Sequence, residues 1–258
     1  MGFSANLGFL FTEHALPDAV RAAARAGFAA IECHEPYATD PGALRAVLDE
    51  TGLPLIGLNA RRGDAARGEF GLAALAGREA DARDAIAEAV IYAAEAGAGF
   101  VHVLAGRSGG GAAAETVFRE ALAFACDLAG EAGIGVLIEP INRRDVPGYH
   151  IAHADAAGET IAALGRPNLK LMYDCYHAGM AGRDIRADLA AHLDHLGHVQ
   201  IAALPDRGEP DRGEIDYAAL LADLRGLGWS RPVGAEYRPR AGWTEEGLGW
   251  LSAFPAEA

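Results

Sequence analysis

Residues 127–142 read DLAGEAGIGVLIEPIN, and this stretch contains the unit from which the fold can be derived. Its first half has the apolar spacing of a helix end, and a glycine follows where a left-handed cap would stop that helix. The second half is a short apolar run, Gly135–Ile141, that suits a strand buried on both faces. Glu139 interrupts this run near its end. The stretch therefore predicts a helix, a tight turn and a buried strand that carries one carboxylate.

The same unit recurs along the chain, and the number of repeats decides the architecture. We count eight strand–helix pairs, and helix ends such as AVRAAARAGF (19–28) and LLADLRGLGW (220–229) carry the same glycine. Regular alternation implies parallel strands with right-handed crossovers, and this number of units closes naturally into a (β/α)8 barrel. The predicted strands are Phe3–Leu10, Ala29–Glu35, Pro54–Asn59, Phe100–Ala105, Gly135–Ile141, Leu169–Asp174, His198–Ala203 and Val233–Tyr237. The predicted helices begin near Pro17, Pro41, Gly77, Ala112, Asp155, Asp184, Asp216 and Thr244.

One barrel domain suits the length of the chain. Such barrels run to about 250 residues as one unit, and no linker interrupts the 258 residues. We therefore predict a single domain over residues 1–258. The alternative is an open doubly wound sheet, but no strand-to-helix turn carries its G-x-G-x-x-G pattern. The glycines at Gly109–Gly111 come closest and are better explained by a flexible loop.

The charge and cysteine content argue against several partners. With 36 acidic and 22 basic residues the net charge is −14, so nucleic acid and anionic membrane surfaces are not expected partners. Cys33, Cys126 and Cys175 are far apart and form no C-x-x-C pair, which favours a reducing cytoplasm. The N-terminus lacks a basic leader region, and no apolar stretch approaches the roughly 18 residues of a membrane span.

Polar side chains lie where four of the later predicted strands end. In barrels of this kind, chemistry takes place at the carboxyl ends of the strands. A buried charge without a partner is costly, so these side chains require one. Carboxylate and amide oxygens suit Mg²⁺ or Mn²⁺ rather than a metal that prefers thiolates. The sequence predicts a divalent metal site held by Glu139, Asp174, Gln200 and Glu236.

Other interpretations stay open at this point. The four side chains could instead form buried ion pairs, and the basic residues available for this are Arg143, Arg238 and Lys170. His177 follows Asp174 closely in YDCYH, and we expect it in the site, whereas His102 in the fourth strand has no assigned role. Arg61 and Arg62 either hold an anionic small molecule or are solvated loop residues.

Taken together, the motifs resemble the hydroxypyruvate isomerase family, a branch of the xylose-isomerase-like TIM barrels. The resemblance covers nearly the whole chain, and its order and spacing make it specific. The matching segments are FSANLGFLFTE (3–13), GDAARGEFGLAALAGRE (63–79), LIEPIN (137–142), DVPGYH (145–150), NLKLMYDCYH (168–177), GHVQIA (197–202), RGEP (207–210), GEIDY (213–217), VGAEYRP (233–239) and TEEGLGWL (244–251).

The resemblance implies a role for each residue of the site. It assigns the metal to the same four side chains, and it makes Glu139 and Glu236 the acid/base pair as well. By the pattern of related ketose epimerases, Asp145 corresponds to a substrate-binding carboxylate. His177 and Arg207 would hold substrate oxygens. The chain departs from the family in the loop after the seventh strand, where an Ala stands in place of the usual Asp.

The implied reaction is the reversible conversion of hydroxypyruvate to 2-hydroxy-3-oxopropanoate (tartronate semialdehyde) through an enediolate. Close alternatives are a 2-oxotetronate (2-dehydrotetronate) isomerase and a related sugar epimerase. A metal-dependent phosphodiesterase of the abasic-site endonuclease type would require more histidine ligands and a basic groove. A noncatalytic sugar-acid binder would not require both glutamates. We expect a small hydroxy-carbonyl acid as the partner and, as is common in such barrels, a homodimer or homotetramer.

Overall fold

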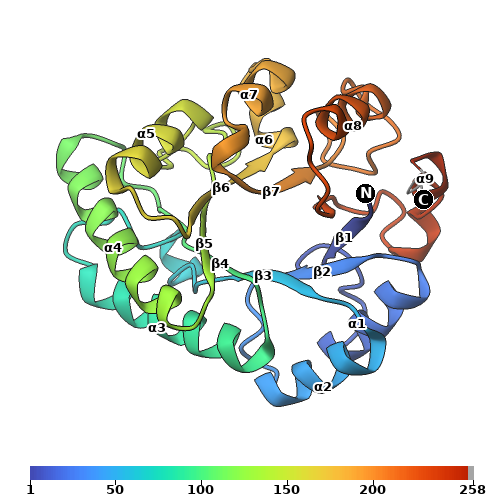
Figure 1. Cartoon of the computed structure of the whole chain (residues 1–258), viewed down its shortest axis with the longest axis horizontal. Coiled ribbons are helices and arrows are strands. Elements are labelled where there is room, and N and C mark those ends of the chain that lie inside the picture. Colours follow the sequence, from blue (N-terminus) through green and yellow to red (C-terminus); the bar gives the residue numbers. More distant parts are fainter. Residues whose placement is uncertain (255–258) are drawn as a thin grey trace.

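A closed barrel of eight parallel strands forms the centre of the molecule (Figure 1). The computed structural model describes residues 1–254. Each strand pairs with its neighbours in chain order, and β1 pairs with β8 to close the ring. This confirms the predicted (β/α)8 barrel. The strands are β1 (Phe3–Asn6), β2 (Ala30–Cys33), β3 (Leu55–Asn59), β4 (Phe100–His102), β5 (Gly135–Ile138), β6 (Leu169–Asp174), β7 (Leu196–Ile201) and β8 (Val233–Ala235).

Helices surround the barrel and begin and end on the expected signals. The carboxylates of Asp40, Asp184 and Asp216 each accept a hydrogen bond from a backbone N–H in the first turn of a helix. Gly52 and Gly97 end helices with φ angles of 72° and 80°, in the left-handed region that glycine adopts without strain. The helices are α1 (Leu16–Arg25), α2 (Pro41–Thr51), α3 (Glu79–Ala96), α4 (Ala112–Glu131), α5 (Ala154–Leu164), α6 (Cys175–Met180), α7 (Ile185–Ala191), α8 (Tyr217–Gly226) and α9 (Trp250–Ala253).

Several predicted boundaries were wrong. The first strand ends at Asn6 rather than Leu10, because the apolar run continues into a turn in which Leu10 is fully buried. The predicted helix near Thr244 is a short 3₁₀ turn followed by α9, and the Thr244 hydroxyl accepts a hydrogen bond from the backbone N–H of Phe11 (2.6 Å) instead of capping a helix. The short helix α6, which begins directly after Asp174, was not predicted.

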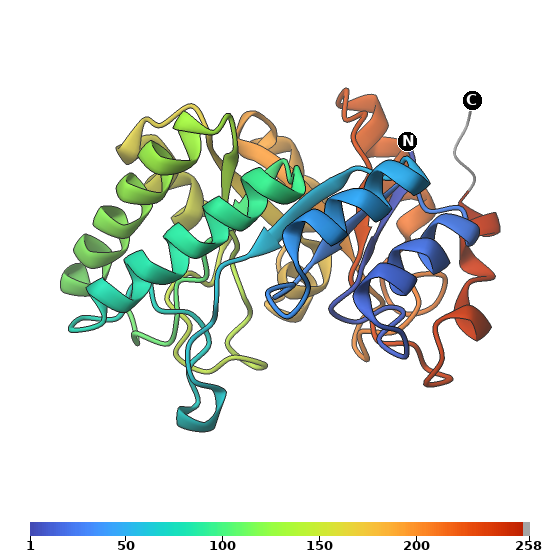
Figure 2. The ribbon, with the colours of Figure 1, turned by 90° about the horizontal axis from the view of Figure 1, so that it is seen from below.

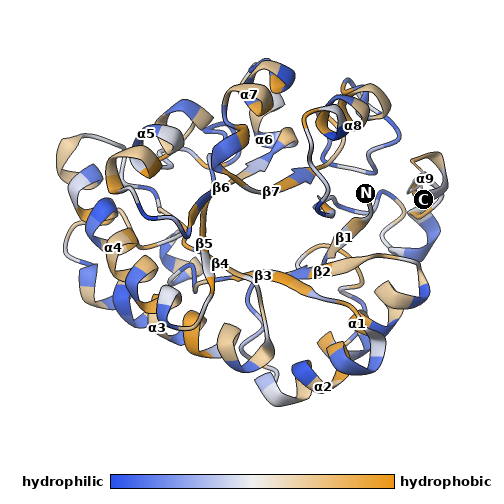
Figure 3. Cartoon of the chain, viewed as in Figure 1, coloured by the Kyte–Doolittle hydropathy of each residue, from blue (hydrophilic) through white to orange (hydrophobic). Residues whose placement is uncertain are grey.

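The apolar core lies between the barrel and its helices, whereas the inside of the barrel holds buried polar side chains such as Ser4, Glu32 and His198. Buried apolar residues come from the strands and from the helices packed around them, and the helices are mixed in hydropathy along their length (Figure 3). Figure 2 shows the long loop after β3, which contains the 3₁₀ turn Ala65–Arg67, reaching away from the barrel on one side. Among residues 1–254, no helix has the length and apolar character needed to cross a membrane.

Candidate active site

A cavity of about 540 Å³ opens where the strands end. Among the residues named from the sequence, its wall contains Arg62, His102, Glu139, Asp145, His177, Arg207, Glu236 and Arg238. They lie at or after the ends of strands β3 to β8, so closure of the barrel is what brings them together. Asp174 and Gln200 are side by side in the register of β6 and β7, and both are buried.

Arg207 is the counter-charge of the carboxylates. Its Nη2 donates to Asp174 Oδ2 at 3.1 Å and to Glu236 Oε2 at 2.8 Å. The alternative of ion pairs with other basic residues was wrong: Arg143 donates to the carbonyls of residues 149 and 150, Lys170 donates to a carbonyl, and Arg238 forms no ion pair within residues 1–254.

The backbone of Arg207 is held in an unusual conformation. Its φ angle is 56°, in the left-handed region that non-glycine residues rarely adopt. The Arg207 carbonyl accepts a hydrogen bond from the N–H of Arg238 at 2.7 Å, and the Arg207 N–H donates to the carbonyl of Ala203 at 2.9 Å. The loop thus fixes the guanidinium between two acids, and strained positions of this kind cluster at functional sites.

Glu236 has two further partners that sequence reasoning missed. Asn6 Nδ2 donates to Glu236 Oε1 at 3.1 Å, and His34 Nε2 lies 2.9 Å from the same oxygen. Asn6 ends β1 and His34 follows β2, so both occupy strand ends in the way that the predicted acids do. Asking which polar residues end the early strands, rather than only the later ones, would have found them.

The environments of Glu139 and Glu236 separate their pKa values. Burial, together with the charges of Glu236 and Asp174, raises the pKa of Glu139 well above its usual range. Burial also opposes ionisation of Glu236, but Arg207 and His34 outweigh it and lower the pKa of that carboxyl. Burial raises the pKa of Asp174 to about 7. Two carboxyls with opposite shifts are the usual arrangement of an acid/base pair.

Buried side chains around Glu139 can hold a metal ion. Ligand atoms of Glu139, Asp174 and His177 lie within 4.8 Å of one another. Glu139 Oε1 and Gln200 Oε1 are buried and have no hydrogen-bond partner among residues 1–254. Unpaired buried oxygens are costly, and a cation would compensate both. The oxygens of Glu139, Asp174 and Gln200 therefore fit a metal centre, whereas the cluster does not include Glu236, and His177 could join it only through Nε2 without its proton.

His177 is oriented by Asn142, another residue that was not predicted. Asn142 Oδ1 accepts the backbone N–H groups of Arg144 (3.0 Å) and Asp145 (2.9 Å), so its Nδ2 is the end that faces His177 Nδ1 at 2.7 Å. An amide nitrogen can only donate, so the proton of the neutral ring is on Nε2. Burial lowers the pKa of His177 to about 3, which keeps the ring neutral. Nε2–H then faces Asp174 Oδ2 (3.7 Å) and can donate to a substrate oxygen.

His102, which had no assigned role, also faces the site. Its Nδ1 lies 3.1 Å from Asn59 Oδ1, an acceptor, so Nδ1 carries the proton. Its Nε2 is left as a lone pair that is 3.8 Å from Glu139 Oε2 and has no hydrogen-bond partner within residues 1–254. Burial lowers the pKa of His102 to about 3. His102 is therefore a neutral acceptor beside Glu139.

Asp145 and several arginines also line the cavity wall. Asp145 accepts hydrogen bonds from Asn142 Nδ2 (3.1 Å) and from the Tyr176 hydroxyl (2.9 Å), which hold its carboxylate at the cavity. Arg62 lines the cavity and pairs with Glu35 at 2.8 Å, whereas Arg61 lies outside and pairs with Glu88. Two more guanidiniums lie in the wall, those of Arg238, which was considered only as an ion-pair partner, and Arg107, which was not predicted.

Comparisons with known proteins agree with this architecture. The model of the xylose isomerase-like TIM barrel family matches residues 20–254. A 2-oxo-tetronate isomerase of Cupriavidus necator is 44% identical over 255 residues, covering 98% of each chain. A hydroxypyruvate isomerase of Escherichia coli is 36% identical, again covering 98% of each chain. A crystal structure from Brucella melitensis, described as an AP endonuclease of family 2, superimposes with a TM-score of 0.93 at 37% identity over 98% of this chain and 99% of that one. The chain therefore belongs to the xylose isomerase-like TIM barrel family.

Proposed function

We propose that this protein is an isomerase that interconverts hydroxypyruvate and 2-hydroxy-3-oxopropanoate, with Mg²⁺ or Mn²⁺ as its metal. The observation that carries the proposal is the placement of Glu139 and Glu236 in the wall of one cavity, beside buried oxygens that fit a cation. Isomerisation moves a proton between adjacent carbons, so two carboxyl groups that can each give or take a proton suit it. The names of the E. coli and C. necator relatives support the same class of reaction.

Glu139, Asp174, Gln200 and Glu236 would hold the metal, which when bound would stabilise the negative charge that develops on the substrate. Side chains of the protein carry out the proton transfers and bind the substrate. One glutamate removes a proton from the carbon that carries the hydroxyl, the other returns a proton at the neighbouring carbon, and the hydroxyl proton passes to the former carbonyl oxygen. His177 Nε2–H donates to a substrate oxygen, because Asn142 fixes its tautomer. Arg207 attracts the substrate carboxylate.

A 2-oxo-tetronate isomerase is the second candidate. The cavity of about 540 Å³ is larger than a three-carbon acid requires, and the relative with this name shares 44% of its residues with the chain. Both candidates use the same chemistry and differ in the length of the substrate. An abasic-site endonuclease activity is less well supported than either isomerase activity, since the net charge of −14 opposes attraction to a phosphate backbone.

The experiment that tests the proposal follows hydroxypyruvate and four-carbon 2-oxo acids by NMR. Metal-loaded protein is incubated with each compound in D₂O, and both the product and the deuterium at the reacting carbons are measured. We expect isomerisation with C–H exchange for at least one of them. Neither product nor exchange with any of these acids would refute the proposed reaction, and turnover restricted to four-carbon acids would select the second candidate.

Replacing Arg207 by Ala should raise KM more than it lowers kcat. The guanidinium would bind the substrate carboxylate alike in the ground state and the transition state, so its loss weakens both. A hydrogen bond to a charged group contributes about 1.5–3 kcal/mol, which corresponds to a KM increase of about 10- to 100-fold. Steady-state kinetics measure it, with Arg61→Ala, outside the cavity, as the control. An unchanged KM would instead point to Arg107 or Arg238.

Metal affinity should rise with pH between about 5.5 and 8. Burial holds the pKa of Asp174 at about 7 and that of Glu139 well above its usual range in the metal-free protein. A metal ion binds the deprotonated carboxylates, so binding releases protons below these pKa values and is weaker at low pH. Titration calorimetry with Mn²⁺ in buffers of different ionisation enthalpy measures both the affinity and the protons released. Affinity that is constant over this range would contradict the ligand set.

A further inference from the structure

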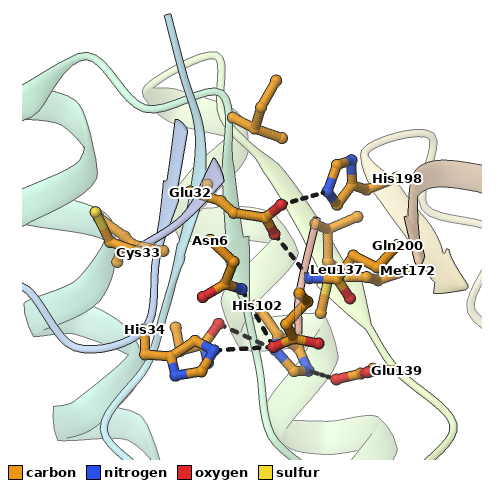
Figure 4. Close-up of a pocket in the computed structure, with 15 residues that line it drawn as sticks. Asn6, Glu32, Cys33, His34, His102, Leu137, Glu139, Met172, His198 and Gln200 are labelled. Atoms are coloured by element: carbon orange, nitrogen blue, oxygen red, sulfur yellow. Dashed lines mark hydrogen bonds and ion pairs between the residues drawn. The ribbon is translucent and has the colours of Figure 1, made fainter. Parts of the chain in front are cut away.

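A second polar layer lies below the catalytic carboxylates, inside the barrel. Its centre is Glu32 on β2, which is 5% exposed. The Ser4 hydroxyl donates to Glu32 Oε1 at 3.1 Å, and His198 Nε2 lies 3.1 Å from the same oxygen. Gln200 Nε2 donates to Glu32 Oε2 at 2.7 Å. Figure 4 shows Glu32 with its carboxylate turned towards His198 and Gln200.

The contact with Glu32 determines which end of the Gln200 amide is left without a hydrogen-bond partner. A carboxylate is an acceptor, so only the amide nitrogen can form the 2.7 Å contact. The amide oxygen of Gln200 must then point elsewhere, and it is buried without a hydrogen-bond partner among residues 1–254. Gln200 lines a small cavity of about 20 Å³ together with Glu139 and Glu236. It also sits opposite Asp174 in the strand register.

The barrel leaves space for this layer at Gly234. A Cβ added to Gly234 would overlap Glu32 Oε1 and would lie 2.7 Å from His198 Nε2 and 2.8 Å from Gln200 Cγ. No special backbone angle requires glycine here, since Gly234 is in β8 and is not among the glycines with positive φ. The requirement is spatial: strand β8 approaches the polar layer closely.

We propose that Glu32 is a positioning residue that fixes the Gln200 amide with its oxygen towards the carboxylates, so that this oxygen serves as a metal ligand. The inference rests on the metal centre of the proposed function and adds the residue that orients one of its ligands. Buried carboxylates that hold the ligands of a metal typically change its affinity about 10- to 100-fold when they are replaced. Glu32 acts through Gln200 and does not itself touch the substrate cavity.

A double-mutant cycle on Mn²⁺ affinity tests the proposal. Glu32→Gln should weaken Mn²⁺ binding about 10- to 100-fold, and Gln200→Ala should weaken it by a similar factor. If Glu32 acts through Gln200, the double variant binds no more weakly than Gln200→Ala alone. Losses that multiply in the double variant, or wild-type affinity in Glu32→Gln, would overturn the proposal. Calorimetry on folded protein gives these affinities without any measurement of activity.

Glu115→Gln is the matched control. Glu115 lies on α4, outside the cavity wall, and it also holds a histidine and a hydroxyl group, with His150 Nε2 at 2.9 Å and the Thr160 hydroxyl at 2.9 Å. The change removes the same charge from a similar network. It should leave Mn²⁺ affinity unchanged. An equal loss in this variant would mean that the effect of Glu32→Gln is a general loss of structure, and the proposal would fail.

The unmodified protein provides a second test that does not depend on folding of a variant. Gln200 is the only glutamine in the sequence, so glutamine labelled with ¹³Cδ and ¹⁵Nε2 gives signals from one side chain. We expect its NH₂ protons to exchange slowly with solvent and its ¹³Cδ signal to shift when Mg²⁺ is added. Rapid exchange, or no ¹³Cδ shift at saturating Mg²⁺, would overturn the proposal. Both signals are independent of isomerase activity, so failure of the proposed reaction would leave this result interpretable.

Discussion

Replacing either Glu139 or Glu236 by Gln is expected to lower kcat by about 10²–10⁴-fold, the usual contribution of general acid/base catalysis. Glutamine keeps the size of the side chain and one oxygen that can bind the metal, but it cannot accept a proton at working pH. Both glutamates line the cavity, and isomerisation needs a proton removed at one carbon and returned at the next. Steady-state kinetics of each variant, with Mn²⁺ binding confirmed by calorimetry, measure the effect.

The two variants should differ in deuterium exchange. If the glutamates serve different carbons, the variant that keeps the base for hydroxypyruvate can still exchange the substrate C–H in D₂O without completing the reaction. The other variant should show neither exchange nor product when hydroxypyruvate is the substrate. The unequal surroundings of the two carboxyls, Arg207 and His34 at Glu236 and burial beside other acids at Glu139, favour this asymmetry. Near-normal turnover in either metal-loaded variant would refute the two-base assignment.

Removal of the metal should abolish turnover, and Mg²⁺ or Mn²⁺ should restore it. Without a cation, Glu139 Oε1 and Gln200 Oε1 have no partner within the described residues, and the pKa of Glu139 is raised by burial. The carboxyls would then compete for protons rather than stabilise charge on the substrate. Activity after exhaustive chelation, and after each metal is added back, measures the dependence.

Full turnover in rigorously metal-free protein would contradict the metal centre. Circular dichroism of the chelated sample is the control, because unfolding would also remove activity. A chelated sample that stays folded and inactive, and that regains turnover with Mg²⁺ or Mn²⁺, is the expected outcome. Mg²⁺ and Mn²⁺ are hard cations that prefer oxygen ligands to thiolates, so we expect these two metals to restore turnover.

The strand-end acids could be predicted because local sequence determines their position. Each interrupts or follows an apolar run, and parallel strands in a barrel bring such positions to one end. Asn6, Glu32 and His34 obey the same rule, yet they were missed. Their partners are Glu236, 230 residues from Asn6, and Gln200, 168 residues from Glu32, so nothing in the neighbouring sequence marks their roles.

Loop conformation determines the side-chain orientations in the site that could not be predicted from the sequence. Arg207 was placed in the site through family resemblance, but its contacts with Asp174 and Glu236 follow from a backbone conformation that a sequence pattern does not report. Asn142 is similar, because its effect on His177 depends on which end of the amide accepts the two backbone N–H groups. Orientation of this kind is a property of the folded loop.

The pairing of β1 with β8 has a consequence for how activity appears during biosynthesis. Glu236 follows β8, and its partners Asn6 and His34 belong to the first two strand units, so the proposed acid/base pair is complete only after the last of the eight barrel strands has been made. A nascent chain that lacks β8 would expose the edges of β1 and β7, and open edges of this kind invite pairing between chains. Pairing of β8 with β1 and β7 is therefore the step at which the barrel would complete the proposed catalytic pair and lose its exposed edges together.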